Sequence, residues 1–212
     1  MKDLDAILTD IPKDSCMART VATGFRVVFE GAMPGGQVAP ATERVDKDSV
    51  SIGDQIWMSH NLQMPADPDN GIFAENGQTY FTWHAAMKAA ASYGNGWRLP
   101  SRKDWARLTA FCGGSRHAGL YLKSKTGWQP DCGLDKYGFN AIPTGYYDTP
   151  YATVRHTDRF TSFWSSSTLD KPCPVNHYKP VYYRTLYGEE LSFPESYGGP
   201  NSGCSVRLVK DA

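Results

Sequence analysis

The chain has 212 residues, with 22 Lys and Arg against 22 Asp and Glu, so its formal net charge is zero. This length suits one domain of ordinary size plus an appendage, and the neutral balance argues against nucleic acid as a partner. No apolar run approaches the roughly 18 residues of a membrane-spanning helix, so we expect no membrane insertion; residues 1–5 begin no visible signal peptide.

Rigid aromatic side chains stand among many turn formers, with 12 Tyr, 6 Trp and 9 Phe beside 20 Gly and 14 Pro. This composition suits a binding surface built from loops. It equally suits a small core filled with large side chains in a fold poor in regular structure. Composition alone does not separate the two interpretations.

The cysteine spacing argues against a structural zinc site, because no C-x-x-C pair occurs. An odd number of cysteines leaves at least one thiol unpaired. Cys112 with Cys132, or Cys173 with Cys204, could form disulfides in an oxidising compartment, and buried free thiols are the alternative. The fifth cysteine is Cys16.

Residues 1–48 differ from the rest of the chain and are predicted to form a β-rich arm or linker. The segment from Thr20 to Phe29 has the β-branched and aromatic content of a strand. Glycines and a proline at 31–36 break it. A segment this short buries little surface by itself. We therefore expect it to dock on the main domain, on another copy in a homo-oligomer, or on a larger assembly.

Residues 49–212 are predicted to form the main domain, which opens with a strand over Ile52–Met58. A long surface loop rich in Pro, Asp, Asn and Gly follows from Asn61 to Asn76. Within it, Asp67–Gly71 only partly resembles a calcium loop, because the glycine comes one position early and no Glu lies six residues after it. We predict no metal site there.

Two short helices are predicted next. Thr82 is placed to cap the first helix, whose apolar face carries Trp83, Ala86, Met87 and Ala90, and Gly94 is placed to end it in the left-handed conformation.

The second helix begins with a capping-box pattern formed by Ser101 and Asp104. Trp105, Leu108 and Cys112 then lie on one face, and two glycines at 113–114 follow.

From Ala118 onward the helical period disappears, and short extended pieces between turns are predicted. Strands are expected over Phe160–Ser167 and Tyr178–Tyr187. The alternation of Val206 and Leu208 with polar neighbours predicts a terminal strand, whose best partner is Ile52–Met58. The predicted class is α+β, with two helices, short antiparallel strands, long loops and paired terminal strands.

An ordered set of motifs covers about 50–212. The motifs are IGDQIWMSHNL (52–62), TYFTW (79–83), GWRLPSRKDWARL (96–108), AGLYLKS (118–124), GLDKYGFNAIPTGYY (133–147), SFWSSS (162–167), YYRTLY (182–187) and GCSVRLVKD (203–211). Together they resemble the FISUMP domain, a repeated paralogous domain of Fibrobacter and Bacteroidetes. Nothing in 1–48 matches.

The resemblance implies a C-type-lectin-like fold whose upper loop region binds ligand, in proteins that are usually secreted or surface-exposed. Similar domains serve as the variable proteins of diversity-generating retroelements, including phage receptor-binding proteins. Two cysteines that the family often carries are replaced here by Tyr93-Gly94 and by Leu208, so a disulfide between those positions is not available. We do not carry over sugar recognition through calcium, for which C-type lectins use Glu-Pro-Asn or Gln-Pro-Asp triplets.

No catalytic or cofactor motif stands out: the five His lack metal spacing, and no G-x-S-x-G or phosphate-binding glycine loop occurs. We therefore expect no enzyme, no cofactor and no metal. Binding is assigned to the aromatic and polar segment near the C-terminus, because Tyr offers a large contact area at small entropy cost. The candidate ligand-binding residues are Tyr178, Tyr183, Arg184, Tyr187, Glu189, Ser192, Phe193, Glu195, Tyr197 and Asn201.

The strand period sends Tyr182, Arg184 and Leu186 to one face and Tyr183, Thr185 and Tyr187 to the other. We expect Tyr183 and Tyr187 to point outward and Trp164 to be core.

The sequence thus predicts a non-enzymatic protein that recognises a protein or glycan on a cell surface, as a retroelement variable protein or a phage receptor binder. We expect it on a virion or at the cell surface. The alternatives are a bacterial adhesin or lipoprotein domain, and a structural oligomerisation module.

Overall fold

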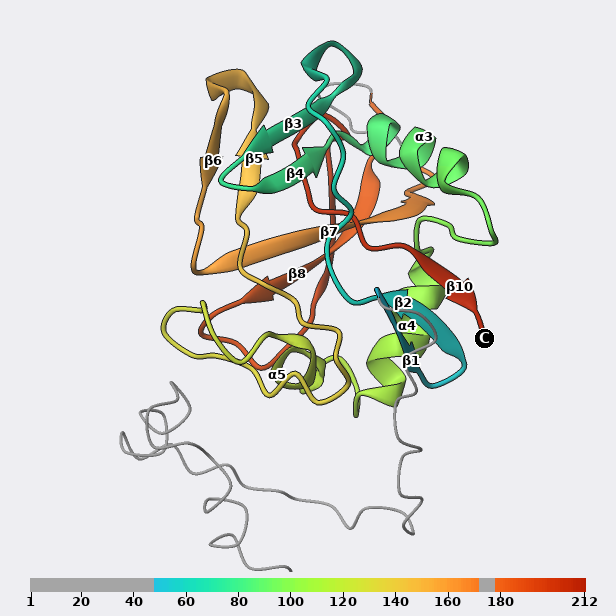
Figure 1. Ribbon diagram of the computed structural model, residues 1–212, viewed down its shortest axis with the longest axis vertical. Coiled ribbons are helices and arrows are strands. Elements are labelled where there is room, and N and C mark those ends of the chain that lie inside the picture. Colours follow the sequence, from blue (N-terminus) through green and yellow to red (C-terminus); the bar gives the residue numbers. More distant parts are fainter. Residues whose placement is uncertain (1–47, 172–177) are drawn as a thin grey trace, which may run out of the picture.

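The computed structural model describes residues 48–171 and 178–212, so the arm predicted for 1–48 lies almost wholly outside the described residues. The described part is α+β, with short helices and small antiparallel sheets (Figure 1). The helices are α3 (Trp83–Tyr93), α4 (Arg102–Phe111) and α5 (Ala118–Leu122), with 3-10 turns η1 (Pro68–Asn70) and η2 (Thr149–Tyr151). The strands are β1 (Ser49–Ile52), β2 (Gln55–Met58), β3 (Ile72–Glu75), β4 (Gln78–Phe81), β5 (Tyr146–Asp148), β6 (Thr153–Arg155), β7 (Phe160–Thr168), β8 (Val181–Tyr187), β9 (Glu195–Gly198) and β10 (Val209–Asp211).

The predicted pairing of the terminal strand is confirmed. In the sheet β1-β2-β10, both outer strands run antiparallel to β2, and Val50 and Val209 both lie opposite Trp57. The hydrogen-bonded strand β10 is shorter than predicted, but the preceding residues stay close, since the carbonyl of Leu208 accepts from the amide of Met58 at 3.1 Å. The C-terminus lies beside β2 in Figure 1.

The two predicted helices form, and both N-terminal caps are confirmed. The Thr82 side chain accepts from the amide of Ala85, and Ser101 and Asp104 make a reciprocal capping box. Gly94 has the expected positive φ of 75°, but its ψ of −166° lies outside the left-handed helical region, so that detail of the prediction is wrong.

A third helix was not predicted. Ala118–Leu122 forms α5 rather than an extended piece, and it carries Gly119 in its first turn. Gly119 is required there because a Cβ would overlap the carbonyl oxygens of Leu191 and Ser192. Packing against that loop therefore overrides the weak local helix preference of the segment.

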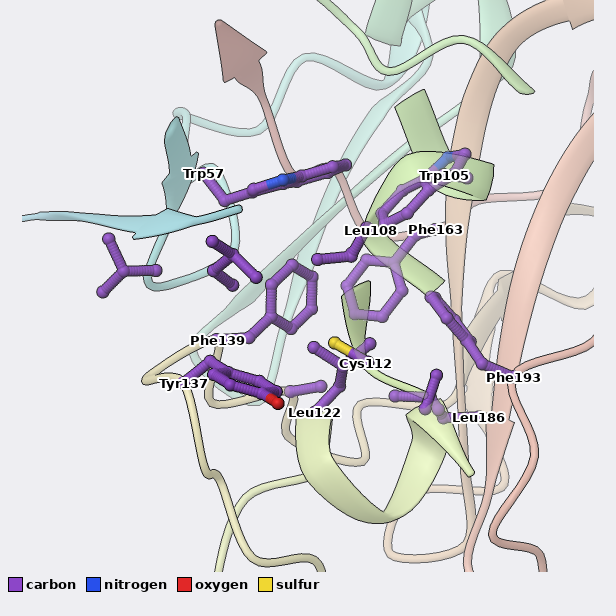
Figure 2. Close-up of a cluster of buried hydrophobic side chains, with 14 of the residues drawn as sticks. Trp57, Trp105, Leu108, Cys112, Leu122, Tyr137, Phe139, Phe163, Leu186 and Phe193 are labelled. Atoms are coloured by element: carbon purple, nitrogen blue, oxygen red, sulfur yellow. The ribbon is translucent and has the colours of Figure 1, made fainter. Parts of the chain in front are cut away.

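The sheet β7-β8-β9 holds the two longest strands of the described residues and contributes side chains to two core clusters. Phe163 and Leu186 belong to the first cluster, whereas Trp164 and Val181 belong to the second. Figure 2 shows the first cluster, in which Trp57 and Trp105 pack with ring centroids 4.7 Å apart. Trp164 is 1% exposed, as predicted for a core residue.

Candidate binding site

One partly exposed aromatic and charged surface joins β8, β9 and the start of α4. We call it the Tyr182 patch, and its members are Arg102, Tyr182, Glu195 and Tyr197. Tyr182 lies opposite Tyr197 in the β8–β9 register, with ring centroids 6.0 Å apart in an edge-on arrangement. The Arg102 guanidinium lies 4.1 Å from the Tyr182 ring centroid, and its Nη2 is 2.6 Å from an oxygen of Glu195.

The Tyr182 patch is exposed at Arg102 and Tyr197 and half-buried at Tyr182 and Glu195. The side chain of Arg102 is 49% exposed, and Tyr197 as a whole is 59% exposed. The Glu195 carboxylate raises the pKa of Arg102 through its hydrogen bond, so the cation is fully charged at any ordinary pH. Two tyrosines fixed on paired strands, with a stacked guanidinium, form a surface that loses little entropy when it binds.

Two of the predicted binding residues are core residues, and their assignment to a surface site is wrong. Phe193 is 0% exposed, and Figure 2 shows it within the first cluster, 5.5 Å from the Trp105 ring. Arg184 is 8% exposed, and its Nη1 donates to the Phe193 carbonyl at 2.7 Å. Burial lowers the pKa of Arg184, while Glu195 acts in the opposite direction. Both residues support the sheet rather than face solvent.

Tyr183 does not form the outward surface that the strand period suggested. It is partly buried against the second cluster, and its ring meets Trp164 edge-on at 5.9 Å. Burial raises its pKa. The expectation failed because a core cluster covers each face of this sheet, so neither set of alternating side chains is free as a whole.

Tyr187 instead joins an aromatic group at the far end of β7 and β8. Its ring lies 5.4 Å from Phe160, which in turn contacts Tyr146 and His156. Tyr182 is the second residue of β8 and Tyr187 is the last, so Tyr187 and the Tyr182 patch lie near opposite ends of the strand. The candidate residues therefore do not converge on a single site.

The loop after β8 carries Glu189, which is exposed, and Ser192, whose hydroxyl donates to the Glu190 carboxylate. Sequence reasoning missed the residue that holds this loop. Lys123 is 0% exposed, and its Nζ donates to the carbonyls of Tyr187, Gly188 and Glu190 at 3.1, 2.8 and 3.0 Å, and to that of Asp131 at 3.2 Å.

The Lys123 ammonium therefore fixes the loop to α5 through backbone carbonyls. Burial lowers its pKa to about 8, with Asp131, Glu189 and Glu190 acting in the opposite direction. The segment after α5 passes close to Lys123, because a Cβ on Gly133 would overlap the Lys123 backbone.

Two further candidates lie in flanking segments. Tyr178 is partly buried, and a Cβ built on Gly199 would stand 3.5 Å from its ring. Asn201 is exposed, and its carbonyl accepts from the Thr149 hydroxyl at 2.6 Å. Both residues therefore lie beside the β8–β9 sheet and outside the Tyr182 patch.

The chain does contain one lectin-type triplet, Gln129-Pro130-Asp131, which sequence reasoning overlooked. The Gln129–Pro130 peptide bond is cis. Among the described residues, no group of three or more His, Cys, Asp or Glu side chains lies together. The triplet alone thus gives no basis for a calcium site.

Both suggested disulfide pairings are wrong. Cys112 and Cys204 are free and buried, and burial raises the pKa of each thiol, to about 12 for Cys112. Cys132 is disulfide-bonded.

Within 48–171 and 178–212, no helix is long and apolar enough to cross a membrane. The model of the Fibrobacter succinogenes major domain matches residues 50–210 of this chain. Proteins with this domain form a class associated with surface or recognition roles. The chain belongs to the Fibrobacter succinogenes major domain family. No curated protein and no solved structure matches it.

Proposed function

We propose that this protein is a non-enzymatic recognition protein that binds a protein or glycan on a cell surface through the Tyr182 patch. The observation that carries the proposal is an exposed Tyr197 packed beside Tyr182, with Arg102 and Glu195 already paired around them. Tyr and Arg dominate the energetic centres of protein interfaces. Because these side chains are already in place, little ordering entropy opposes binding.

Matched variants test the proposal, with whole-cell binding of the purified chain as the assay. Tyr197→Ala is compared with Tyr151→Ala, since Tyr151 is 70% exposed but belongs to another surface. Likewise Arg102→Ala is compared with Arg155→Ala. Arg155 is the matched control because its guanidinium also lies over a tyrosine ring, 4.9 Å from the Tyr151 ring centroid. We expect the patch variants to weaken binding about 30-fold or more, as for loss of about 2 kcal/mol at a hot spot. Equal losses in the Tyr151 and Arg155 variants would reject the patch.

We further propose a C-type-lectin-like fold and a role as the variable protein of a diversity-generating retroelement or as a phage receptor binder, on a virion or cell surface. The paired strands β2 and β10 and the long loops between the helices and β7 support this arrangement. Sequencing the 3′ end of the gene in natural populations tests it. Variation should gather in codons 164–202, include Tyr197, and spare Arg184 and Phe193. Flat variation would favour the adhesin or lipoprotein alternative.

A structural oligomerisation module is the remaining alternative. In that case assembly would bury the Tyr182 patch between copies. Light scattering separates the two: Tyr197→Ala should leave the mass of a recognition protein unchanged, whereas it should dissociate an oligomer that is held through the patch.

A further inference from the structure

A pocket of about 240 Å³, lined mainly by residues with polar side chains, shares no residue with the Tyr182 patch. Four stretches of the chain form it: the loop after β2, the β3–β4 turn, the segment 140–142, and the strand-like stretch before β10. Its lining residues are His60, Asn61, Gln63, Gly77, Gln78, Asn140, Ile142 and Arg207. Sites for drug-sized ligands usually exceed about 300 Å³, so this volume fits a smaller ligand such as a single sugar unit.

One of the lining residues is a buried cation. Arg207 is 1% exposed, and its Nε donates to the Asn61 side-chain oxygen at 2.8 Å. Its Nη1 donates to the carbonyls of Met58 and Phe139, and its Nη2 donates to that of Asn140 at 3.0 Å. A guanidinium has five N–H groups, so one N–H on Nη2 has no acceptor in the described part of the chain.

The positive charge of Arg207 faces the rings of Phe139 and Phe163, with centroids 4.6 and 5.7 Å away, but it has no ion-pair partner among the described residues. No described carboxylate lies within ion-pair distance of it, and Asp135 acts on it only at longer range. Burial lowers its pKa to about 9, so it is still protonated at neutral pH. A buried charge is costly unless it is paired. A ligand carboxylate in the pocket would supply the missing charge and the missing acceptor together.

The other lining residues offer groups that can hydrogen-bond to the hydroxyls of a ligand and one side chain that can contact an apolar face of it. Gln78 and Gln63 belong to a network of amides, with the Gln63 Nε2 donating to the Gln78 Oε1 at 3.4 Å. The side chains of Asn140 and His60 have no hydrogen-bond partner within the described ranges, so they are available to a ligand. Ile142 provides the only apolar side chain of the lining. A sugar ring presents hydroxyls around its edge and C–H groups on its faces.

We propose that this pocket binds a sugar acid, either free or as the end of a glycan, with its carboxylate on Arg207 and its hydroxyls on the amides of Asn140 and Gln78. The binding is expected to be weak, because few contacts are available in so small a pocket. The carboxylate should account for most of the selectivity, since a charge-assisted hydrogen bond is about twice as strong as a neutral one.

The test is an NMR titration of the full chain with sodium glucuronate, with glucose as the neutral match and acetate as the bare carboxylate. We expect glucuronate to shift the Arg207 Nε–H and the Asn140 and Gln78 side-chain amides, and to bind about tenfold more tightly than glucose or acetate. Methyl glucuronide distinguishes the two sources, because only a pocket that accepts glycan ends should tolerate the added methyl group. Equal affinity for glucose, or glucuronate shifts elsewhere only, would overturn the proposal.

A variant pair separates the pocket from general stability. Asn140 has a φ of 50°, and its backbone rather than its side chain contacts Arg207 and Asp135. Asn140→Gly therefore removes the amide while keeping a suitable backbone. Asn95→Gly is the control, because Asn95 has a φ of 53° and is exposed elsewhere. We expect only Asn140→Gly to weaken glucuronate binding, by about fivefold. If Asn140→Gly binds glucuronate as tightly as the unmodified chain, and glucuronate leaves the Arg207 resonance unmoved, the site is refuted.

Discussion

Replacing Lys123 by Met should strongly destabilise the fold, because the ammonium is the shared donor for four carbonyl oxygens. The contacts to Tyr187, Gly188 and Glu190 connect α5 to the loop that leads into β9. The fourth contact, to Asp131, joins the same point to the segment after α5. Met has a similar length and no donor, so the substitution removes these bonds without leaving a large cavity.

The expected loss can be worked out from the burial of each bond. The bond to the Gly188 carbonyl is fully buried, and the other three are partly buried. A buried acceptor left without a donor costs about 1–3 kcal/mol, and less where water can reach it. Removing the desolvated ammonium offsets part of this cost. The net loss in free energy of unfolding is therefore about 3 kcal/mol.

Urea unfolding followed by tryptophan fluorescence measures the loss, with Lys125→Met as the control, because Lys125 is exposed. The control should stay within about 0.5 kcal/mol of the unmodified chain. Hydrogen exchange should also quicken at the backbone amides of 188–192 in Lys123→Met. A loss below about 1 kcal/mol, with unchanged exchange, would show that the four contacts do not hold the loop.

Four further results are expected. Phe193→Ala should lower the free energy of unfolding in urea by about 3–5 kcal/mol, because Phe193 is a core residue. Tyr197→Ala should change it by less than about 0.5 kcal/mol, because Tyr197 is exposed. Similar losses in the two variants would contradict the assignment of Phe193 to the core and Tyr197 to the surface. Ser101→Ala should lose about 1 kcal/mol with its capping box, and a neutral result would show that the cap is not needed. Because burial raises the pKa of Cys112 to about 12 and also raises that of Cys204, neither thiol should react with Ellman's reagent at pH 8 until the chain unfolds. Above pH 9 the unfolded thiols ionise while the folded ones keep their protons, so stability should fall as pH rises there.

Local signals predicted the features that depend on neighbouring residues. Thr82 and Ser101 were recognisable as caps because a cap needs only a hydroxyl and an amide two or three residues later. The pairing of β2 with β10 followed from two compatible strand patterns and the need to hold a chain end.

Features that depend on distant contacts were missed. Alternation in β8 separates two sets of side chains, but it does not reveal that a core cluster covers each set. Lys123 and Arg207 were missed because Lys and Arg are usually exposed, and no local pattern shows that distant carbonyls will surround them. Arg102 joins the Tyr182 patch only because α4 begins beside β9, which is a tertiary relationship.

The sheet β1-β2-β10 has a practical consequence for building with this domain. Ser49 and Asp211 begin and end two strands that flank β2, and strand spacing and rise place them on the order of 15 Å apart. A flexible linker of a few residues can span that distance. The domain is therefore suited to insertion as a cassette into a surface turn of a host protein, or to circular permutation, with the Tyr182 patch left unaltered.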